Sequence, residues 1–113
     1  MLYTRRHMQR NFSQRVWELA LSIPEGRVTT YGTLAKAAGG VGQASRSVSR
    51  ILSRSPNAKA IPWHRIVYAG GKTWLTDECE DWRRELYELE GVLVNEKGII
   101  TNFDEIFYDF SEY

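Results

Sequence analysis

Three short stretches between residues 12 and 54 have the apolar spacing of amphipathic helices, and glycines interrupt the chain between them. The first stretch, residues 12–23, follows Asn11, a good N-cap, and Gln14 completes a capping-box pattern three residues later. Its inward residues are predicted to be Phe12, Val16, Leu19 or Ala20, and Ile23. Together, the three stretches predict a small, mainly helical domain.

The second and third stretches together form a helix-turn-helix pattern. Thr30 can cap a helix that ends at Gly39 and Gly40, and a third helix is predicted at about residues 44–54. The inward residues of these two helices are predicted to be Leu34, Ala35, Ala38, Val48, Ile51 and Leu52. Two short helices, a glycine-containing turn and a basic second helix are typical of the helix-turn-helix motif.

The third predicted helix has a basic stripe and a row of small polar residues. Arg46, Arg50 and Arg54 recur at every fourth position and should lie along one exposed face. Ser45 and Ser49 recur one position earlier, together with Ser53. Small side chains of this kind allow the helix backbone to approach another surface closely.

The second half of the chain adds one helix and one hairpin. A helix is predicted at residues 77–91, with Trp82, Leu86 and Leu89 inward and Gly91 at its end. Residues 92–101 have two β-branched runs around a turn and predict a β-hairpin. The predicted fold class is therefore mainly α with a small β-hairpin, arranged as a winged helix-turn-helix.

The predicted organisation is an N-terminal extension at residues 1–11, one domain at residues 12–103 and an acidic, aromatic tail at residues 104–113. The tail is expected either to pack back on the domain or to remain loose. No apolar run approaches the roughly 18–20 residues of a membrane span, and the N-terminus lacks a signal peptide's apolar region. An intracellular protein is expected, in the cytoplasm or nucleoid, or in the nucleus of a eukaryote.

Charge is distributed very unevenly along the sequence. Residues 1–75 contain 12 Lys or Arg and two acids, whereas residues 76–113 contain three Lys or Arg and 12 acids, so the net charge of +1 conceals two opposite halves. This asymmetry favours a polyanionic partner for the first part, and the alternative is that the two halves attract each other. The single cysteine, Cys79, excludes an internal disulfide, and the separated His7 and His64 do not form a metal-ligand pair. No metal or cofactor is predicted.

Residues 62–65, Pro-Trp-His-Arg, are the most informative short stretch. Taken singly, Trp63 suits a core aromatic residue, His64 suits a buried histidine with satisfied hydrogen bonds, and Arg65 suits a surface charge. Pro62 fixes the local backbone. None of the four residues implies a function alone, but they follow a basic helix.

Four motifs in register resemble the DNA-binding domain of the O6-alkylguanine-DNA alkyltransferases, over about residues 12–94. These motifs are RVWELALSIPEGRVTTYGTLAKAAG, SRSVSRIL, IPWHRIV and YELEGV. In that family the residue between the proline and the histidine is the cysteine that accepts the alkyl group, and here it is Trp63. The chain is similar to the alkyltransferase-like proteins, which bind damaged DNA without repairing it and flag it for nucleotide excision repair.

The resemblance implies a monomeric, non-enzymatic protein that binds duplex DNA carrying O6-alkylguanine, with nucleotide excision repair proteins as partners. Arg46 would enter the base stack from the minor groove and fill the space of the extruded nucleotide, and Tyr31 would press on the adjacent phosphate. The DNA-binding residues implied are Thr30, Tyr31, Ser45, Arg46, Ser47 and Arg50. The alternatives are that Arg46 makes one phosphate contact among three arginines and that Tyr31 packs on a loop.

The same resemblance implies a pocket for the flipped base, with Trp63 as a wall or floor. The implied lining residues are Tyr31, Pro62, Trp63, Ile66, Trp74 and Thr76. His64 and Glu90 match the relay that would activate the missing cysteine, so they are expected to form a structural hydrogen-bonded pair. Some relatives have a basic residue near Thr76 that senses the altered base, and Lys72 is the nearest candidate here.

Three other functions remain open at this point. A winged-helix regulator would read a specific sequence in undamaged DNA with the same basic helix. A true alkyl acceptor would need Cys79 as nucleophile, although Glu78 and Glu80 are expected to raise the pKa of its thiol. A protein-interaction domain would use the acidic tail at residues 104–113.

Overall fold

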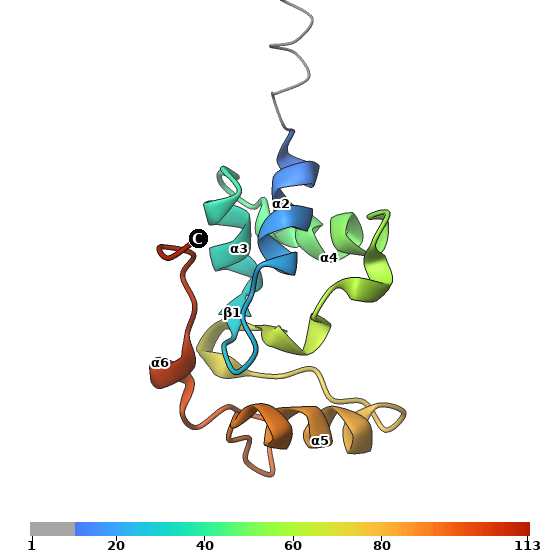
Figure 1. Cartoon of the computed structure of the whole chain (residues 1–113), viewed down its shortest axis with the longest axis vertical. Coiled ribbons are helices and arrows are strands. Elements are labelled where there is room, and N and C mark those ends of the chain that lie inside the picture. The colour runs from blue at the N-terminus through green and yellow to red at the C-terminus, as the bar shows by residue number, and fades with distance from the viewer. Residues whose placement is uncertain (1–10) are drawn as a thin grey trace, which may run out of the picture.

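The computed structural model describes residues 11–113, so the N-terminal extension predicted at residues 1–11 lies almost entirely outside the described residues. The elements are α2 (Phe12–Leu21), β1 (Thr29–Thr30), α3 (Tyr31–Ala37), α4 (Ser45–Ser53), η1 (Ala58–Ala60), η2 (Trp63–Arg65), β2 (Ile66–Val67), η3 (Ala69–Gly71), α5 (Glu80–Glu90) and α6 (Phe103–Ile106). Figure 1 shows α2, α3 and α4 gathered in one cluster, with α5 running below it. The predicted mainly α, helix-turn-helix class is confirmed.

Helices α2 and α3 begin where their capping residues predict, whereas α4 begins after Ala44 without a side-chain cap. The Gln14 backbone N–H donates to the Asn11 side chain at 2.8 Å, and the Asn11 backbone N–H donates to the Gln14 side chain at 3.2 Å. The Thr33 N–H donates to the Thr30 hydroxyl at 3.0 Å and so caps α3. These bonds satisfy backbone donors that the first turn of each helix would otherwise leave free.

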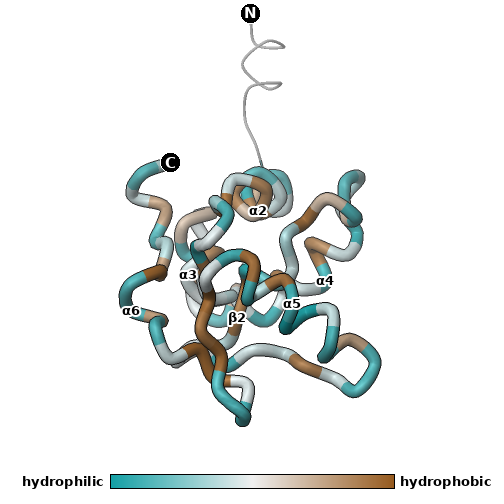
Figure 2. The backbone as a smooth tube through the Cα atoms, turned by 60° about the horizontal axis from the view of Figure 1, so that its bottom comes forward, coloured by the Kyte–Doolittle hydropathy of each residue, from teal (hydrophilic) through white to brown (hydrophobic). Residues whose placement is uncertain are grey.

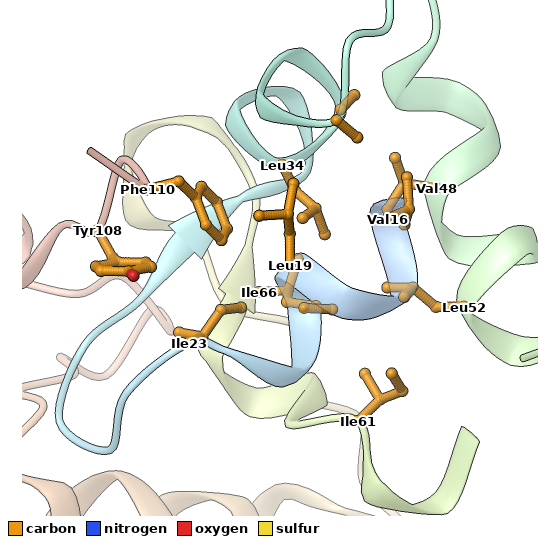
Figure 3. Packing of buried hydrophobic residues seen from close by; sticks show 13 residues of the cluster. Val16, Leu19, Ile23, Leu34, Val48, Leu52, Ile61, Ile66, Tyr108 and Phe110 are labelled. Atoms are coloured by element: carbon orange, nitrogen blue, oxygen red, sulfur yellow. The ribbon is translucent and has the colours of Figure 1, made fainter. Parts of the chain in front are cut away.

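The main core lies between α2, α3 and α4. Figure 3 shows Val16 and Leu19 of α2, Leu34 of α3, and Val48 and Leu52 of α4 pointing toward one another. A second, smaller cluster lies toward α5. Its buried residues are Val28, Val67, Tyr87, Val92 and Ile100. The predicted inward residues of the three helices are therefore confirmed as core, except that Phe12 and Ile51 are only partly buried.

The predicted hairpin is present only in a short form, and the defined sheet lies elsewhere. The defined strands are β1 and β2, which pair in parallel with Thr29 opposite Ile66 and Thr30 opposite Val67. Residues 92–101 contain one antiparallel bridge, Val94–Ile100, in place of a longer ladder. The Asn95 N–H donates to the Ile99 carbonyl and the Thr101 N–H to the Leu93 carbonyl, but the return bonds are missing because the Ile99 and Leu93 N–H groups donate to asparagine side chains.

The buried face of α5 also differs from the prediction. Arg83 and Tyr87 are its buried residues, whereas Trp82 and Leu89, both predicted inward, are 50% and 82% exposed. Helix α5 contacts the rest of the domain largely through polar and charged side chains, so the apolar spacing does not mark its inner face. Figure 2 shows that hydrophilic residues predominate along this helix.

The acidic, aromatic tail packs back on the domain. Tyr108 and Phe110 belong to the main core and are 4% and 8% exposed. The Tyr108 N–H donates to the Val28 carbonyl at 2.7 Å, and the Val28 N–H donates to the Ile106 carbonyl at 3.0 Å. No helix within residues 11–113 combines the length and apolar character needed to cross a membrane.

Candidate nucleic-acid interface

Two adjoining cavities lie between α3, α4 and the segment that follows β2. The first, here called the Arg46 cavity, has a volume of about 450 Å³ and is lined by Thr30, Tyr31, Gly32, Ser45, Arg46, Ser49, Tyr68 and Ala69. The second, called the Trp63 cavity, has a volume of about 530 Å³ and is lined by Tyr31, Ser49, Trp63, Tyr68, Trp74 and Arg83. Tyr31, Ser49 and Tyr68 line both, so Arg46 and Trp63 lie on either side of a shared wall.

The predicted DNA-binding residues occupy two sides of α4. Thr30, Tyr31, Ser45 and Arg46 line the Arg46 cavity. The other two, Ser47 and Arg50, line a groove between α2 and α4, together with Phe12, Ser13, Trp17, Ala44, Ile51 and Arg54. The side chains of the three stripe arginines are exposed, and none of the three forms a salt bridge with a residue in the 11–113 range.

Trp63 is held at the cavity by the short helix η2. Its indole N–H donates to the Ala58 carbonyl at 3.3 Å, and its ring packs against the main core. The Tyr31 and Tyr68 rings stack at a tilt, with centroids 5.5 Å apart. Burial and then the neighbouring Tyr68 raise the pKa of Tyr31, so its hydroxyl stays protonated and can donate a hydrogen bond.

Three of the six residues predicted for the lesion pocket do not line this cavity. Pro62 precedes η2 and is half-buried, and Ile66 is a core residue with 4% exposure. The Thr76 hydroxyl is 3.2 Å from the Cys79 sulfur, at the start of α5. The role of Pro62, Ile66 and Thr76 in a pocket stays a prediction, whereas Tyr31, Trp63 and Trp74 are brought together.

Glu90 joins α5 to the Trp63 segment through a dense set of hydrogen bonds. The predicted hydrogen bond between His64 and Glu90 is present, with Nε2 and Oε2 2.8 Å apart. Arg65 donates to both carboxylate oxygens, at 3.0 and 2.7 Å, and the Gly26 N–H donates at 3.1 Å. Gly91, at a φ of 77°, ends the helix directly after Glu90.

The environment of Glu90 keeps its carboxylate charged. Burial alone would raise its pKa, but hydrogen bonds from Arg65, His64 and the Gly26 N–H outweigh burial and lower the pKa of Glu90 to about 2. The side chains of Glu90, His64 and Arg65 are 5%, 13% and 18% exposed. This network fixes the position of α5 relative to Trp63.

The sequence interpretation missed Arg83, Ser49 and Tyr68 as lining residues. Arg83 projects from α5 and is 7% exposed, although its neighbour Trp82 was expected to be the inward residue. Recognising Arg83 from the sequence would have required the correct rotation of α5, which the apolar spacing does not give. Lys72, the basic candidate by sequence position, is exposed and lines neither cavity.

Cys79 lies outside both cavities. Its thiol pKa was expected to be raised by Glu78 and Glu80, but hydrogen bonds from Thr76 lower the pKa of Cys79. The expected direction was wrong because a local hydrogen bond outweighs more distant carboxylates. Within residues 11–113, no group of three or more His, Cys, Asp or Glu side chains could hold a metal ion.

Comparisons with known proteins agree on one family for this chain. Residues 11–92 match the family described as 6-O-methylguanine DNA methyltransferase, DNA binding domain. The DNA base-flipping protein of Escherichia coli is 43% identical over 90 residues, which are 80% of this chain and 69% of that protein.

Two solved structures are similar to the fold. Schizosaccharomyces pombe Atl1, in complex with damaged DNA containing O6-carboxymethylguanine, aligns with a TM-score of 0.67 and 25% identity, over 88% of this chain and 98% of that chain. Mycobacterium tuberculosis OGT in complex with DNA aligns with a TM-score of 0.57 and 36% identity, over 73% of this chain and half of that one. The chain belongs to the family of the 6-O-methylguanine DNA methyltransferase DNA-binding domain.

Proposed function

We propose that this chain binds duplex DNA containing O6-alkylguanine, turns the altered nucleotide into the Trp63 cavity and leaves the alkyl group in place. The observation that carries the proposal is the shared wall of Tyr31, Ser49 and Tyr68 between Arg46 and Trp63. A residue that replaces a flipped base must lie beside the pocket that receives that base. The similarity to a base-flipping protein and to Atl1 bound to damaged DNA supports the same function.

Arg46 is suited to occupy the space of the extruded nucleotide. It is exposed near the N-terminus of α4, and the small residues Ser45 and Ser47 on either side allow close approach to DNA. A planar guanidinium can stack on bases and donate to the unpaired partner base. Extrusion costs a few kcal/mol, which this replacement and burial of the flipped base would help to offset.

The replacement of a thiol by Trp63 supports the absence of alkyl transfer. An indole offers no nucleophilic atom, and its N–H is already engaged by Ala58. The His64–Glu90 pair remains, but its hydrogen bond now serves to hold α5. Cys79 lines neither cavity and is not positioned to take over the reaction.

A bound but unrepaired lesion needs a second repair system. In this proposal the chain acts inside the cell as a monomer, enters the minor groove with α4, and passes the lesion to nucleotide excision repair proteins. Ser47, Arg50 and Thr30 would contact phosphates on either side of the flipped nucleotide.

Binding and transfer can be measured on the same oligonucleotides. Fluorescence anisotropy should show affinity for a duplex with one O6-methylguanine that exceeds affinity for the unmodified duplex by about tenfold or more. Intact-protein mass spectrometry after incubation should show no added methyl group. Equal affinity for both duplexes, or a methylated protein, would contradict the proposal.

Two arginine variants separate base replacement from phosphate contact. Arg46→Ala should abolish most of the preference for the damaged duplex, whereas Arg54→Ala, which removes the same charge from the same helix, should weaken binding to both duplexes alike. A sequence-selected footprint on undamaged DNA, with no preference for the lesion, would instead support the winged-helix regulator.

A further inference from the structure

Arg83 is a buried cation without a matching anion. It is 7% exposed and lines the Trp63 cavity. Its Nε has no hydrogen-bond partner, its Nη1 donates a long bond, 3.3 Å, to the Trp74 carbonyl, and the buried Tyr87 hydroxyl lies close to the guanidinium. Arg83 forms no salt bridge with any residue between 11 and 113.

The neighbours of Arg83 compensate its charge only in part. The guanidinium carbon lies 5.9 Å from the centre of the Trp74 ring and 5.3 Å from that of Trp82, which are cation–π distances. The nearby carboxylates of α5 have other partners, because Glu80 binds Arg84 and Glu90 binds His64 and Arg65. A buried guanidinium that lacks a counter-ion is costly.

The remaining walls of the cavity are neutral. They consist of four aromatic side chains and one serine, namely Tyr31, Ser49, Trp63, Tyr68 and Trp74. Burial raises the pKa of Tyr31, and it raises the pKa of the adjacent Tyr87 to about 12, so neither phenol supplies a negative charge near neutral pH. The cavity therefore presents a single positive charge to whatever enters it.

We propose that the Trp63 cavity favours O6-substituents that end in a carboxylate, and that Arg83 is the residue that determines this specificity. The inference rests on the proposed function, since it requires the flipped base to enter this cavity. A guanidinium binds a carboxylate through two parallel charge-assisted hydrogen bonds. Arg83 lines the cavity while its Nε is enclosed by protein, so a carboxylate would meet the terminal nitrogens of the guanidinium.

Three lesions of defined chemistry test the charge preference. Duplexes are made with O6-methylguanine, O6-carboxymethylguanine or O6-carbamoylmethylguanine, in which an amide of nearly the same size replaces the carboxylate. The protein should bind the carboxymethyl duplex about tenfold or more tightly than the carbamoylmethyl duplex. Because an added negative charge on DNA can also increase its general attraction to the basic α4 face, variants of Arg83 are needed to assign the preference to a local contact.

Arg83 variants assign the preference to one side chain. Arg83→Gln should bring the carboxymethyl and carbamoylmethyl affinities close to each other, and Arg83→Lys should retain part of the difference. Arg84→Gln is the matched control, because Arg84 is adjacent on α5 but pairs with Glu80 and lies outside the Trp63 cavity. This control should keep the full preference.

The wild-type comparison can overturn the inference even if an Arg83 variant fails to fold. Equal affinity for the carboxymethyl and carbamoylmethyl duplexes would overturn it, as would a preference that persists in folded Arg83→Gln. Failure of the proposed function gives a different result, in which O6-methylguanine is bound no better than guanine.

Discussion

At the scale of single residues, Glu90 links three segments of the chain. Its carboxylate accepts hydrogen bonds from His64, Arg65 and the Gly26 backbone, and its side chain is 5% exposed. Arg65 also donates to the Ile23 carbonyl at 3.0 Å, so the network extends to the end of α2. Removing the one anion would leave the Arg65 charge buried without a partner.

Glu90→Gln should therefore lower the free energy of unfolding near neutral pH by about 3 kcal/mol, as measured by urea denaturation. The pKa of Glu90 falls from 4.5 to about 2 on folding, so its ionisation stabilises the fold above pH 4.5 and this contribution is lost as pH falls toward 2. The difference between wild type and variant should shrink over that interval. Glu88→Gln, an exposed change on the same helix, should have little effect, and a pH-independent difference would contradict the assignment.

At the scale of elements, the turn between α3 and α4 depends on a close approach at Gly40. A Cβ atom added there would lie 2.7 Å from the Ala44 Cβ, 2.9 Å from the Phe12 ring and 3.0 Å from the Ala35 carbonyl oxygen. The Gly40 N–H also donates to that carbonyl at 2.9 Å. The angle between the two helices of the motif is therefore set by contacts that exclude any side chain at Gly40.

Gly40→Ala should lower the free energy of unfolding by about 1–3 kcal/mol, because the backbone contact cannot move aside without shifting α3 relative to α4. Gly32→Ala is the control, since Gly32 is inside α3 and only the Thr30 hydroxyl lies within 4.0 Å of the new Cβ. That variant should be as stable as wild type, or more stable by up to about 1 kcal/mol. Thermal or urea denaturation of both proteins checks the pair, and equal losses would show that the turn is adaptable.

The elements that the sequence predicts well are those whose determinants are local. Capping residues and apolar spacing define α2 and α3, and apolar spacing alone defines α4, because each signal lies within or next to the helix that it describes. The parallel pairing of β1 and β2 joins two-residue strands that are far apart in the sequence, and no local pattern specifies it. The position of Arg83 could not be predicted for the same reason. Arg83 lines the Trp63 cavity because Glu90 fixes the rotation of α5 through contacts with distant segments.

At the scale of the whole molecule, the acidic tail returns to the N-terminal helices and completes the main core. The Phe110 ring packs edge-on against Tyr108 at 4.9 Å between centroids, and the Arg27 guanidinium carbon lies 5.3 Å from the centre of the Tyr108 ring. Phe110→Ala should cost about 3 kcal/mol of stability in urea denaturation. Tyr113→Ala, at a position that is 68% exposed, should cost almost nothing, and equal stability of the two variants would contradict the docked tail.

Within residues 11–113, a few ion pairs join the two charged parts of the chain. Arg27 pairs with Glu112, and His64 and Arg65 pair with Glu90, whereas the arginines of α4 remain outside the salt bridges of the described chain. Attraction between the halves therefore does not use the basic stripe. A polyanionic partner that contacts α4 better explains the exposed arginines of this stripe, because exposed cations repel one another until a partner neutralises them.

The position of the basic stripe predicts how DNA binding depends on salt concentration. The logarithm of the DNA-binding constant should fall linearly with the logarithm of salt concentration, with a slope of about −0.9 for each phosphate contact. Arg54→Ala should make that slope shallower by about 1. Glu105→Lys changes the net charge by a larger amount than Arg54→Ala does. Because α6, which contains Glu105, lies away from α4 in Figure 1, the salt dependence of this variant should match that of wild type. Anisotropy titrations at several salt concentrations measure all three slopes. If Glu105→Lys alters the slope as much as Arg54→Ala, the polyanion responds to overall charge and the interface is not confined to the α4 face.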